Sequence, residues 1–87
     1  MSRNDKTKPA ARVIASLSDG KTLISDWTNR ANANLKSAYV RTHYPDAQVT
    51  IVRGRIPVDI IMDQQDQIFD NGDDAEAYLS EQNNSFA

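Results

Sequence analysis

The sequence predicts an α+β fold, in which an antiparallel sheet of four to five strands carries two helices on one face. Segments that alternate apolar and polar residues, with the period of two typical of strands, lie between residues 12 and 27 and between residues 49 and 70. Residues 28–44 and 73–82 instead repeat their apolar residues with the spacing of a helix. The predicted order is strand, strand, helix, strand, strand, short strand, helix.

The first two strands are predicted to form a hairpin over residues 12–27. Apolar and polar residues alternate on both sides of Asp19 and Gly20. An Asp-Gly pair between two alternating runs is a strong hairpin signal, because a type I′ turn requires positive φ at both central residues. We therefore expect two antiparallel strands joined by a type I′ turn.

The first helix is predicted over residues 28–44, with Thr28 as its N-cap and Pro45 ending it. Residues at helical spacing are predicted to form its buried stripe: Ala31, Leu35, Ala38, Tyr39 and Thr42. The opposite face is predicted to be a polar ridge: Arg30, Asn34, Ser37 and Arg41.

Two further strands follow the first helix. Residues 49–52 and 56–62 alternate apolar and polar side chains, and Pro57 places the second of them near a sheet edge or at its own beginning. Residues 67–70 are predicted to form a short fifth strand, after which the last helix runs over residues 73–82.

Two terminal segments are predicted to lie outside the single α+β domain, which spans residues 12–82. Residues 1–11 are polar, positively charged and contain a proline, a composition typical of a disordered arm. Residues 83–87 are predicted to form a frayed tail. A chain of 87 residues leaves room for one domain with a small core.

The composition excludes several kinds of catalytic and metal site. The chain has no cysteine and one histidine, His43, which are too few ligands for a standard zinc site and provide no thiol nucleophile. The carboxylates do not follow the spacing of a calcium loop, and the glycines are isolated. We therefore predict a protein that is not an enzyme and that has no cofactor or metal site. The first eleven residues contain no apolar run of the kind that a signal peptide requires, and no apolar stretch approaches the roughly 18 residues of a membrane span, so we expect a cytoplasmic protein.

Charge is divided between the two parts of the chain. Residues 1–55 carry all ten lysines and arginines and four carboxylates, a balance of +6, whereas residues 56–87 carry eight carboxylates and no lysine or arginine, a balance of −8. Such a division affects the electrostatic steering of approaching molecules and the choice of partner more than it affects the fold. The predicted partner-binding residues are the carboxylates Asp59, Asp63, Asp66, Asp70, Asp73, Asp74 and Glu76. We expect them to engage a basic surface of a protein partner.

Small, cysteine-free, acidic α+β proteins of this size resemble the inhibitors that phages and other mobile elements make against host nucleic-acid machinery, anti-CRISPR proteins among them. The resemblance lies in size, charge and the ending from Phe69-Asp70 to Tyr78-Leu79. It implies a non-catalytic module that inhibits or regulates a nucleic-acid-processing protein. The final strand and acidic helix are also similar to the DNA-damage-inducible family that modulates a recombinase filament.

Direct nucleic-acid binding by the basic half is the alternative function. Its predicted residues are Arg30, Arg41, Arg53 and Arg55. Arg53-Gly54-Arg55 resembles the core of an AT-hook, which lies in the minor groove of A·T-rich DNA. The order of elements from the first helix onward resembles double-stranded-RNA-binding domains, although carboxylates replace the lysines that those domains carry at the start of their last helix. A homo-oligomer formed through a sheet edge near Pro57 is a third possibility.

Overall fold

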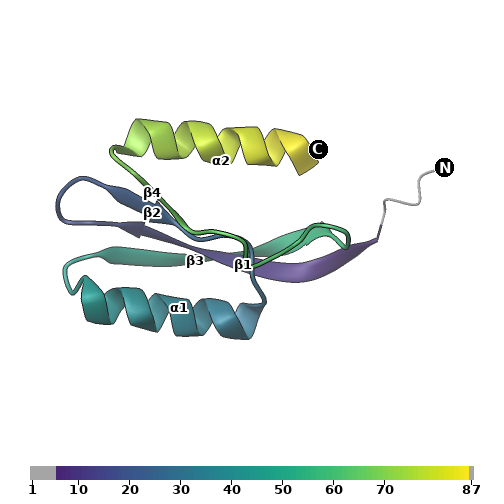
Figure 1. The fold of residues 1–87 in the computed structure, drawn as a ribbon, viewed down its shortest axis with the longest axis horizontal. Coiled ribbons are helices and arrows are strands. Elements are labelled where there is room, and N and C mark those ends of the chain that lie inside the picture. Colours follow the sequence, from purple (N-terminus) through teal and green to yellow (C-terminus); the bar gives the residue numbers. More distant parts are fainter. Residues whose placement is uncertain (1–5, 87) are drawn as a thin grey trace.

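The α+β class is confirmed by a four-stranded antiparallel sheet and two helices (Figure 1). The computed structural model describes the backbone of residues 6–86 and the side chains of residues 6–81. The elements, in chain order, are β1 (Thr7–Ser16), β2 (Thr22–Ile24), α1 (Arg30–His43), β3 (Gln48–Pro57), β4 (Gln67–Phe69) and α2 (Gly72–Phe86). This order agrees with the predicted one, except that one long strand replaces two shorter ones after α1.

The strands lie in the order β3-β1-β2-β4, and each neighbouring pair is antiparallel. The longest pair is β1 with β3, whose register runs without interruption from Thr7 opposite Pro57 to Ser16 opposite Gln48. The pairs of β2 with β1 and with β4 each extend over three residues. Within the described sheet, β3 and β4 are therefore the two edge strands.

The start of β1 corrects the predicted disordered arm. The strand begins at Thr7, so residues 7–11 belong to the sheet, and residues 1–5 lie outside the described part of the chain. Ala10 and Ala11 are completely buried. Residues 7–11 contain a proline and no large apolar side chain, so nothing in their own composition indicates a strand. The strand forms because they pair with β3, which is far away in the chain.

One continuous strand, β3, stands where two were predicted. It passes through Gly54, and a loop over residues 58–66 then begins with a turn in which the Ile60 N–H donates to the Pro57 carbonyl at 3.1 Å. A Cβ atom on Gly54 would lie 4.0 Å from the Trp27 ring, an ordinary van der Waals distance, so the ring leaves room for a methyl group at this position. The glycine lies within the paired strand and does not end it.

The hairpin between β1 and β2 has a different turn from the predicted type I′. The Leu17 N–H donates to the Lys21 carbonyl at 2.8 Å, and the Gly20 N–H donates to the Leu17 carbonyl at 3.1 Å. Gly20 has a φ of 90°, whereas Asp19 does not have positive φ. This arrangement is a three-residue loop with glycine in the left-handed region, the next most common way to join two antiparallel strands.

The helices lie on opposite faces of the sheet, which corrects the predicted placement on one face (Figure 1). Val13 of β1 packs in a core cluster with Ala33 and Val40 of α1. The adjacent residue, Arg12, points to the other side, where its guanidinium carbon lies 5.9 Å from the ring centroid of Tyr78 in α2. Because successive side chains of a strand point to opposite faces, α1 and α2 are separated by the sheet.

The first helix begins one residue later than predicted and is capped by Asn29. The Asn29 side chain accepts a hydrogen bond from the Asn32 N–H at 2.7 Å. Thr28, the predicted cap, is completely buried and bridges to Ala11 of β1. Asn29 therefore caps the helix, because Thr28 is held by its bridge to the sheet. Sequence alone does not distinguish the two, since threonine and asparagine are both good N-cap residues.

The face of α1 that contacts the sheet is also different from the predicted stripe. The buried residues are Ala33, Ser37 and Val40, whereas Leu35 and Tyr39 are 69% and 64% exposed. Small side chains let the helix lie close to the strands, and the Ser37 hydroxyl donates to the Asn34 carbonyl at 2.9 Å, which reduces the cost of burying it. The larger apolar side chains of the helix, Leu35 and Tyr39, face away from the sheet.

The second helix extends beyond its predicted end. Its backbone runs to Phe86, so residues 83–86 continue the helix where a frayed tail was predicted, and Ala87 lies outside the described residues. Asn71 precedes the helix, and its side-chain oxygen accepts from the Asp74 N–H at 2.8 Å. The rings of Phe69 and Tyr78 lie 5.1 Å apart and fasten α2 to β4. Neither described helix combines the length and the apolar character needed to cross a membrane.

Candidate functional site

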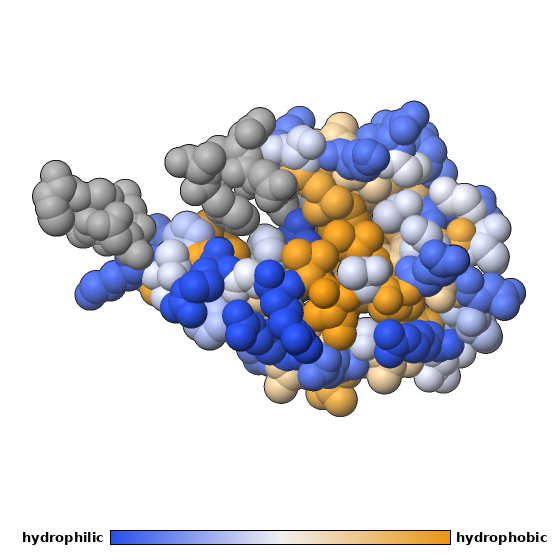
Figure 2. Space-filling view, turned by 180° about the vertical axis from the view of Figure 1, so that it is seen from behind, coloured by the Kyte–Doolittle hydropathy of each residue, from blue (hydrophilic) through white to orange (hydrophobic). Residues whose placement is uncertain are grey.

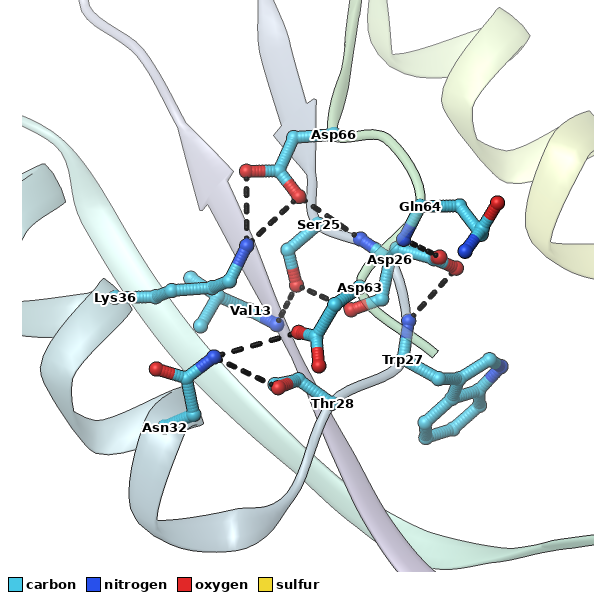
Figure 3. A network of polar contacts seen from close by, with 10 residues as sticks. All are labelled: Val13, Ser25, Asp26, Trp27, Thr28, Asn32, Lys36, Asp63, Gln64 and Asp66. Carbon is cyan, nitrogen blue, oxygen red and sulfur yellow. Dashed lines mark hydrogen bonds and ion pairs between the residues drawn. The ribbon is translucent and has the colours of Figure 1, made fainter. Parts of the chain in front are cut away.

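Two of the predicted partner-binding carboxylates, Asp63 and Asp66, take part in a network of polar contacts beside α1 (Figure 3). The Asp66 carboxylate accepts from the Lys36 ammonium, with Nζ 3.0 Å from Oδ1 and 3.1 Å from Oδ2, and from the Asp26 N–H at 3.1 Å. The Asp63 carboxylate accepts from the side-chain amide of Asn32 at 3.4 Å. These two carboxylates therefore hold the loop of residues 58–66 against α1.

Asp26 is the centre of this network and was not predicted as a functional residue. Its carboxylate accepts from the Gln64 N–H at 2.7 Å and from the Trp27 N–H at 2.9 Å. The neighbouring Ser25 hydroxyl accepts from the Val13 N–H at 2.8 Å and donates to the Asp26 carbonyl at 3.0 Å. The network thus connects β1, the segment between β2 and α1, and the 58–66 loop, and its role is structural.

The other predicted carboxylates are exposed, and four of them gather where β4 meets the first turn of α2. This acidic corner consists of Asp70, Asp73, Asp74 and Glu76. One Asp74 oxygen accepts from the Asn71 side-chain amide at 3.3 Å, and part of the corner stabilises the positive end of the helix dipole. Asp59 lies apart from the corner, in the turn that follows β3.

Three of the four predicted nucleic-acid-binding arginines lie together at the other edge of the sheet. Arg53 and Arg55 flank Gly54 in β3, and the Arg30 guanidinium donates from Nη2 to the Gly54 carbonyl at 3.4 Å. Arg55 also donates to Thr7 of β1, from Nε to Oγ1 at 2.8 Å and from Nη2 to the carbonyl at 3.1 Å. Both strand arginines have odd numbers and therefore lie on the α1 face.

The fourth arginine, Arg41, lies near the C-terminal end of α1. Its distance from Arg30 in the sequence corresponds to about three whole helical turns, which places both side chains on the same side of the helix. We call these four residues the arginine edge: Arg30, Arg41, Arg53 and Arg55. The division of charge in the sequence is therefore also a division in space, with the arginine edge along β3 and the acidic corner beside β4.

Apolar side chains accompany the arginine edge. Val49 and Ile51 of β3 are partly buried against the core beneath α1, and Val52 on the opposite face of the strand is 37% exposed. Figure 2, which views the molecule from behind, shows an apolar patch bordered along one side by strongly hydrophilic groups. Such a combination of exposed apolar and charged groups is typical of a binding surface.

Arg12 is the most unusual buried residue, and sequence reasoning missed it because it looked like the polar member of an alternating strand. It is 2% exposed and lies in the layer between β1 and α2. Burial lowers the pKa of its guanidinium, while Tyr78, by charge and by a hydrogen bond, and Asp26, by charge, oppose this shift. Its Nε and Nη2 atoms have no hydrogen-bond partner among the described residues.

The described residues contain no group of three or more His, Cys, Asp or Glu side chains that could hold a metal ion. The single histidine packs its ring against Tyr39 at the end of α1, with the ring centroids 4.1 Å apart. Comparisons with protein-family models, with curated proteins and with solved structures found no match. The two charged surfaces, the acidic corner and the arginine edge, are the candidate functional surfaces among the described residues.

Proposed function

We propose that the chain is a non-catalytic protein-binding module, a small inhibitor or regulator of the kind that phages and mobile elements make. In this proposal the acidic corner binds a basic surface of a nucleic-acid-processing protein. The observation that supports it is the exposure of four carboxylates at one corner, none of which forms an ion pair with another described residue. Complementary potentials of this kind raise association rates and exclude partners of the wrong charge.

Only some of the seven predicted carboxylates are proposed to contact the partner. Asp63 and Asp66 accept hydrogen bonds from Asn32 and Lys36 and are therefore assigned to folding. The acidic corner is the main contact surface, and Asp59 is left as a separate exposed charge. A partner that approaches the corner also meets the first turn of α2, where part of the negative charge is offset by the helix dipole.

The test is a double charge reversal with a matched control. Asp70→Lys with Asp73→Lys changes the corner, and Asp19→Lys with Asp46→Lys makes the same change in net charge at exposed positions elsewhere. Proteins retained from nuclease-treated host extract on the wild-type chain are purified, and each is titrated against the three forms of the chain. We expect the corner variant to lose the partner and the control variant to keep it. Equal affinity for all three forms would refute the proposal.

Direct nucleic-acid binding is the competing function, and it would use the arginine edge. Labelled duplex DNA, duplex RNA and single strands are titrated with the wild-type chain at about 50 mM and about 200 mM salt, because phosphate contacts cause a steep loss of affinity with salt. Under the proposal, no nucleic acid binds at the lower salt concentration. Salt-sensitive binding that disappears in Arg53→Ala would favour the competing function.

A further inference from the structure

The outer side of β3 presents a row of backbone groups that no described strand pairs. The N–H and carbonyl of Ala11 bond to Thr28 at 2.8 and 2.9 Å, so odd-numbered residues of β1 direct their backbone groups away from β3. Even-numbered residues of the two strands bond to each other, a pattern that the Val58 N–H continues by donating to the Lys6 carbonyl at 3.3 Å. The residues of β3 whose N–H and carbonyl groups point outward are therefore Val49, Ile51, Arg53 and Arg55.

This edge lacks most of the features by which proteins prevent a strand from being added. Edge strands are usually protected by shortness, bulges, prolines or charged side chains. β3 has the charges of Arg53 and Arg55, but it is ten residues long, its register with β1 is continuous, and its proline is its last residue. β4, at the other edge, is three residues long and is therefore protected by its length.

The side chains along the edge select the kind of strand that would fit. Arg53 and Arg55 extend from the α1 face of β3, close to Arg30 at the start of the helix, and Arg41 lies about three turns further along α1. Neither β3 nor α1 contains a carboxylate. On the opposite face the strand presents Val52 and the exposed Thr50. A strand added here has side chains that alternate between these two environments, one positively charged and one apolar or neutral.

We propose that the free edge of β3 is a second interaction surface, which binds an extended protein segment with carboxylates on alternate residues. The segment adds a fifth strand to the sheet, its backbone pairs with the outward groups of β3, and its carboxylates face the arginine edge. This surface is separate from the acidic corner, so the inference goes beyond the proposed function and does not depend on it.

Charge distinguishes this occupant from a second copy of the chain. If β3 paired antiparallel with β3 of another copy, the arginines of both copies would lie along the same seam with no carboxylate from either strand between them. Like charges on neighbouring strands are unfavourable, whereas opposite charges stabilise the pairing. The arginines therefore oppose self-pairing and favour an acidic segment.

The backbone distinguishes a protein strand from nucleic acid. Arginines bind phosphates and carboxylates alike, but phosphate oxygens only accept hydrogen bonds. The outward row of β3 alternates donors with acceptors, which another polypeptide strand matches and a phosphate backbone does not. The experiment therefore removes an outward N–H group and the arginine charge separately.

The probe is a blocked peptide that alternates glutamate and threonine, titrated against the full chain by NMR with labelled backbone amides. Arg53→Ala removes one arginine and keeps the N–H, whereas Arg53→Pro removes both, and the β1 ladder is unaffected because this N–H points outward. We expect wild-type binding with shifts at the Ile51 and Arg53 amides. Affinity should fall several-fold in Arg53→Ala and by about tenfold more in Arg53→Pro, as the loss of backbone hydrogen bonding predicts.

Controls separate binding from folding and from the acidic corner. Thermal unfolding reports whether Arg53→Pro folds, and a peptide N-methylated at alternate residues tests the same backbone bonds on the wild-type chain. The Asp70→Lys/Asp73→Lys variant should bind the peptide as tightly as wild type, whatever it does to the partner of the corner. Equal affinity of Arg53→Pro and Arg53→Ala, full binding of the N-methylated peptide, absence of peptide binding, or preference for duplex DNA would each overturn the proposal.

Discussion

The guanidinium carbon of Arg12 lies 4.5 Å from the ring centroid of Trp27, in the layer between β1 and α2. This pair places a cation in a buried position where water is excluded. The contact with the indole face returns part of the lost hydration energy, about 0.5 to 2 kcal/mol for such interactions. Two guanidinium nitrogens without a described hydrogen-bond partner show that the compensation is incomplete.

Replacement of Arg12 by methionine should therefore leave the protein at least as stable as wild type. Methionine is similarly long and flexible, so it fills the space without the cost of burying a charge. Arg12→Ala leaves a cavity and should lower the free energy of unfolding by about 2 to 4 kcal/mol. Urea unfolding measures both values. A methionine variant as unstable as the alanine variant would show that the cation itself stabilises the fold.

The free energies of unfolding of wild type and Arg12→Met should depend on pH in the same way between about pH 6 and pH 8. Burial lowers the pKa of Arg12 because the buried site disfavours the charged guanidinium. The folded state is therefore destabilised at every pH at which the folded protein keeps this charge. It is relieved only as pH rises through the folded-state pKa towards the unfolded one, far into the alkaline range. The gap between wild type and Arg12→Met should therefore be constant over neutral pH, and a slope would contradict this assignment.

The carboxylates of the loop and of the corner should respond differently to alanine substitution. Asp66→Ala removes the acceptor for the Asp26 N–H and for Lys36, and it should lower the free energy of unfolding by about 0.5 to 1.5 kcal/mol. Asp70→Ala removes an exposed side chain and should change stability by less than about 0.5 kcal/mol. Chemical denaturation of the two variants provides the comparison. Equal effects would contradict the division into structural and exposed carboxylates.

The parts of the fold that sequence predicts well are those set by local rules. Pro45 follows soon after the end of α1, and the alternation around Gly20 gives the first hairpin, although its turn type differs. Residues 7–11 were missed because their strand character comes from pairing with β3 and not from their own composition. Long-range pairing of this kind leaves little trace in a local pattern.

Sequence indicates where the charged residues are, but it does not show which of them have partners within the fold. The exposed corner follows from charge and from the start of α2, both visible in the sequence. The assignment of Asp63 and Asp66 required the positions of Asn32 and Lys36, which lie on another element. Charge alone does not tell a carboxylate that binds a partner from one that fastens a loop.

Gly20 and Gly72 should differ in their tolerance of alanine. Gly20 has a φ of 90°, a conformation that side-chain-bearing residues adopt at a cost of about 1 to 2 kcal/mol, although space around it is free. Gly72 begins α2, has ordinary φ and also has free space, so Gly72→Ala should be neutral or stabilising by up to about 1 kcal/mol. Thermal unfolding of the two variants compares them, and equal melting temperatures would contradict the turn geometry.

The exposed stripe of α1 provides the sharpest test of which helix face contacts the sheet. Leu35→Ser changes a side chain that is 69% exposed, so the free energy of unfolding should change by less than about 0.5 kcal/mol. Val40→Ser, made on the same helix, buries a hydroxyl and loses packing in the core cluster beneath α1, at an expected cost of about 1 to 3 kcal/mol. Urea unfolding at one pH measures the two values directly. If Leu35→Ser were the more damaging change, the helix would have to be turned so that the stripe predicted from sequence faces the strands.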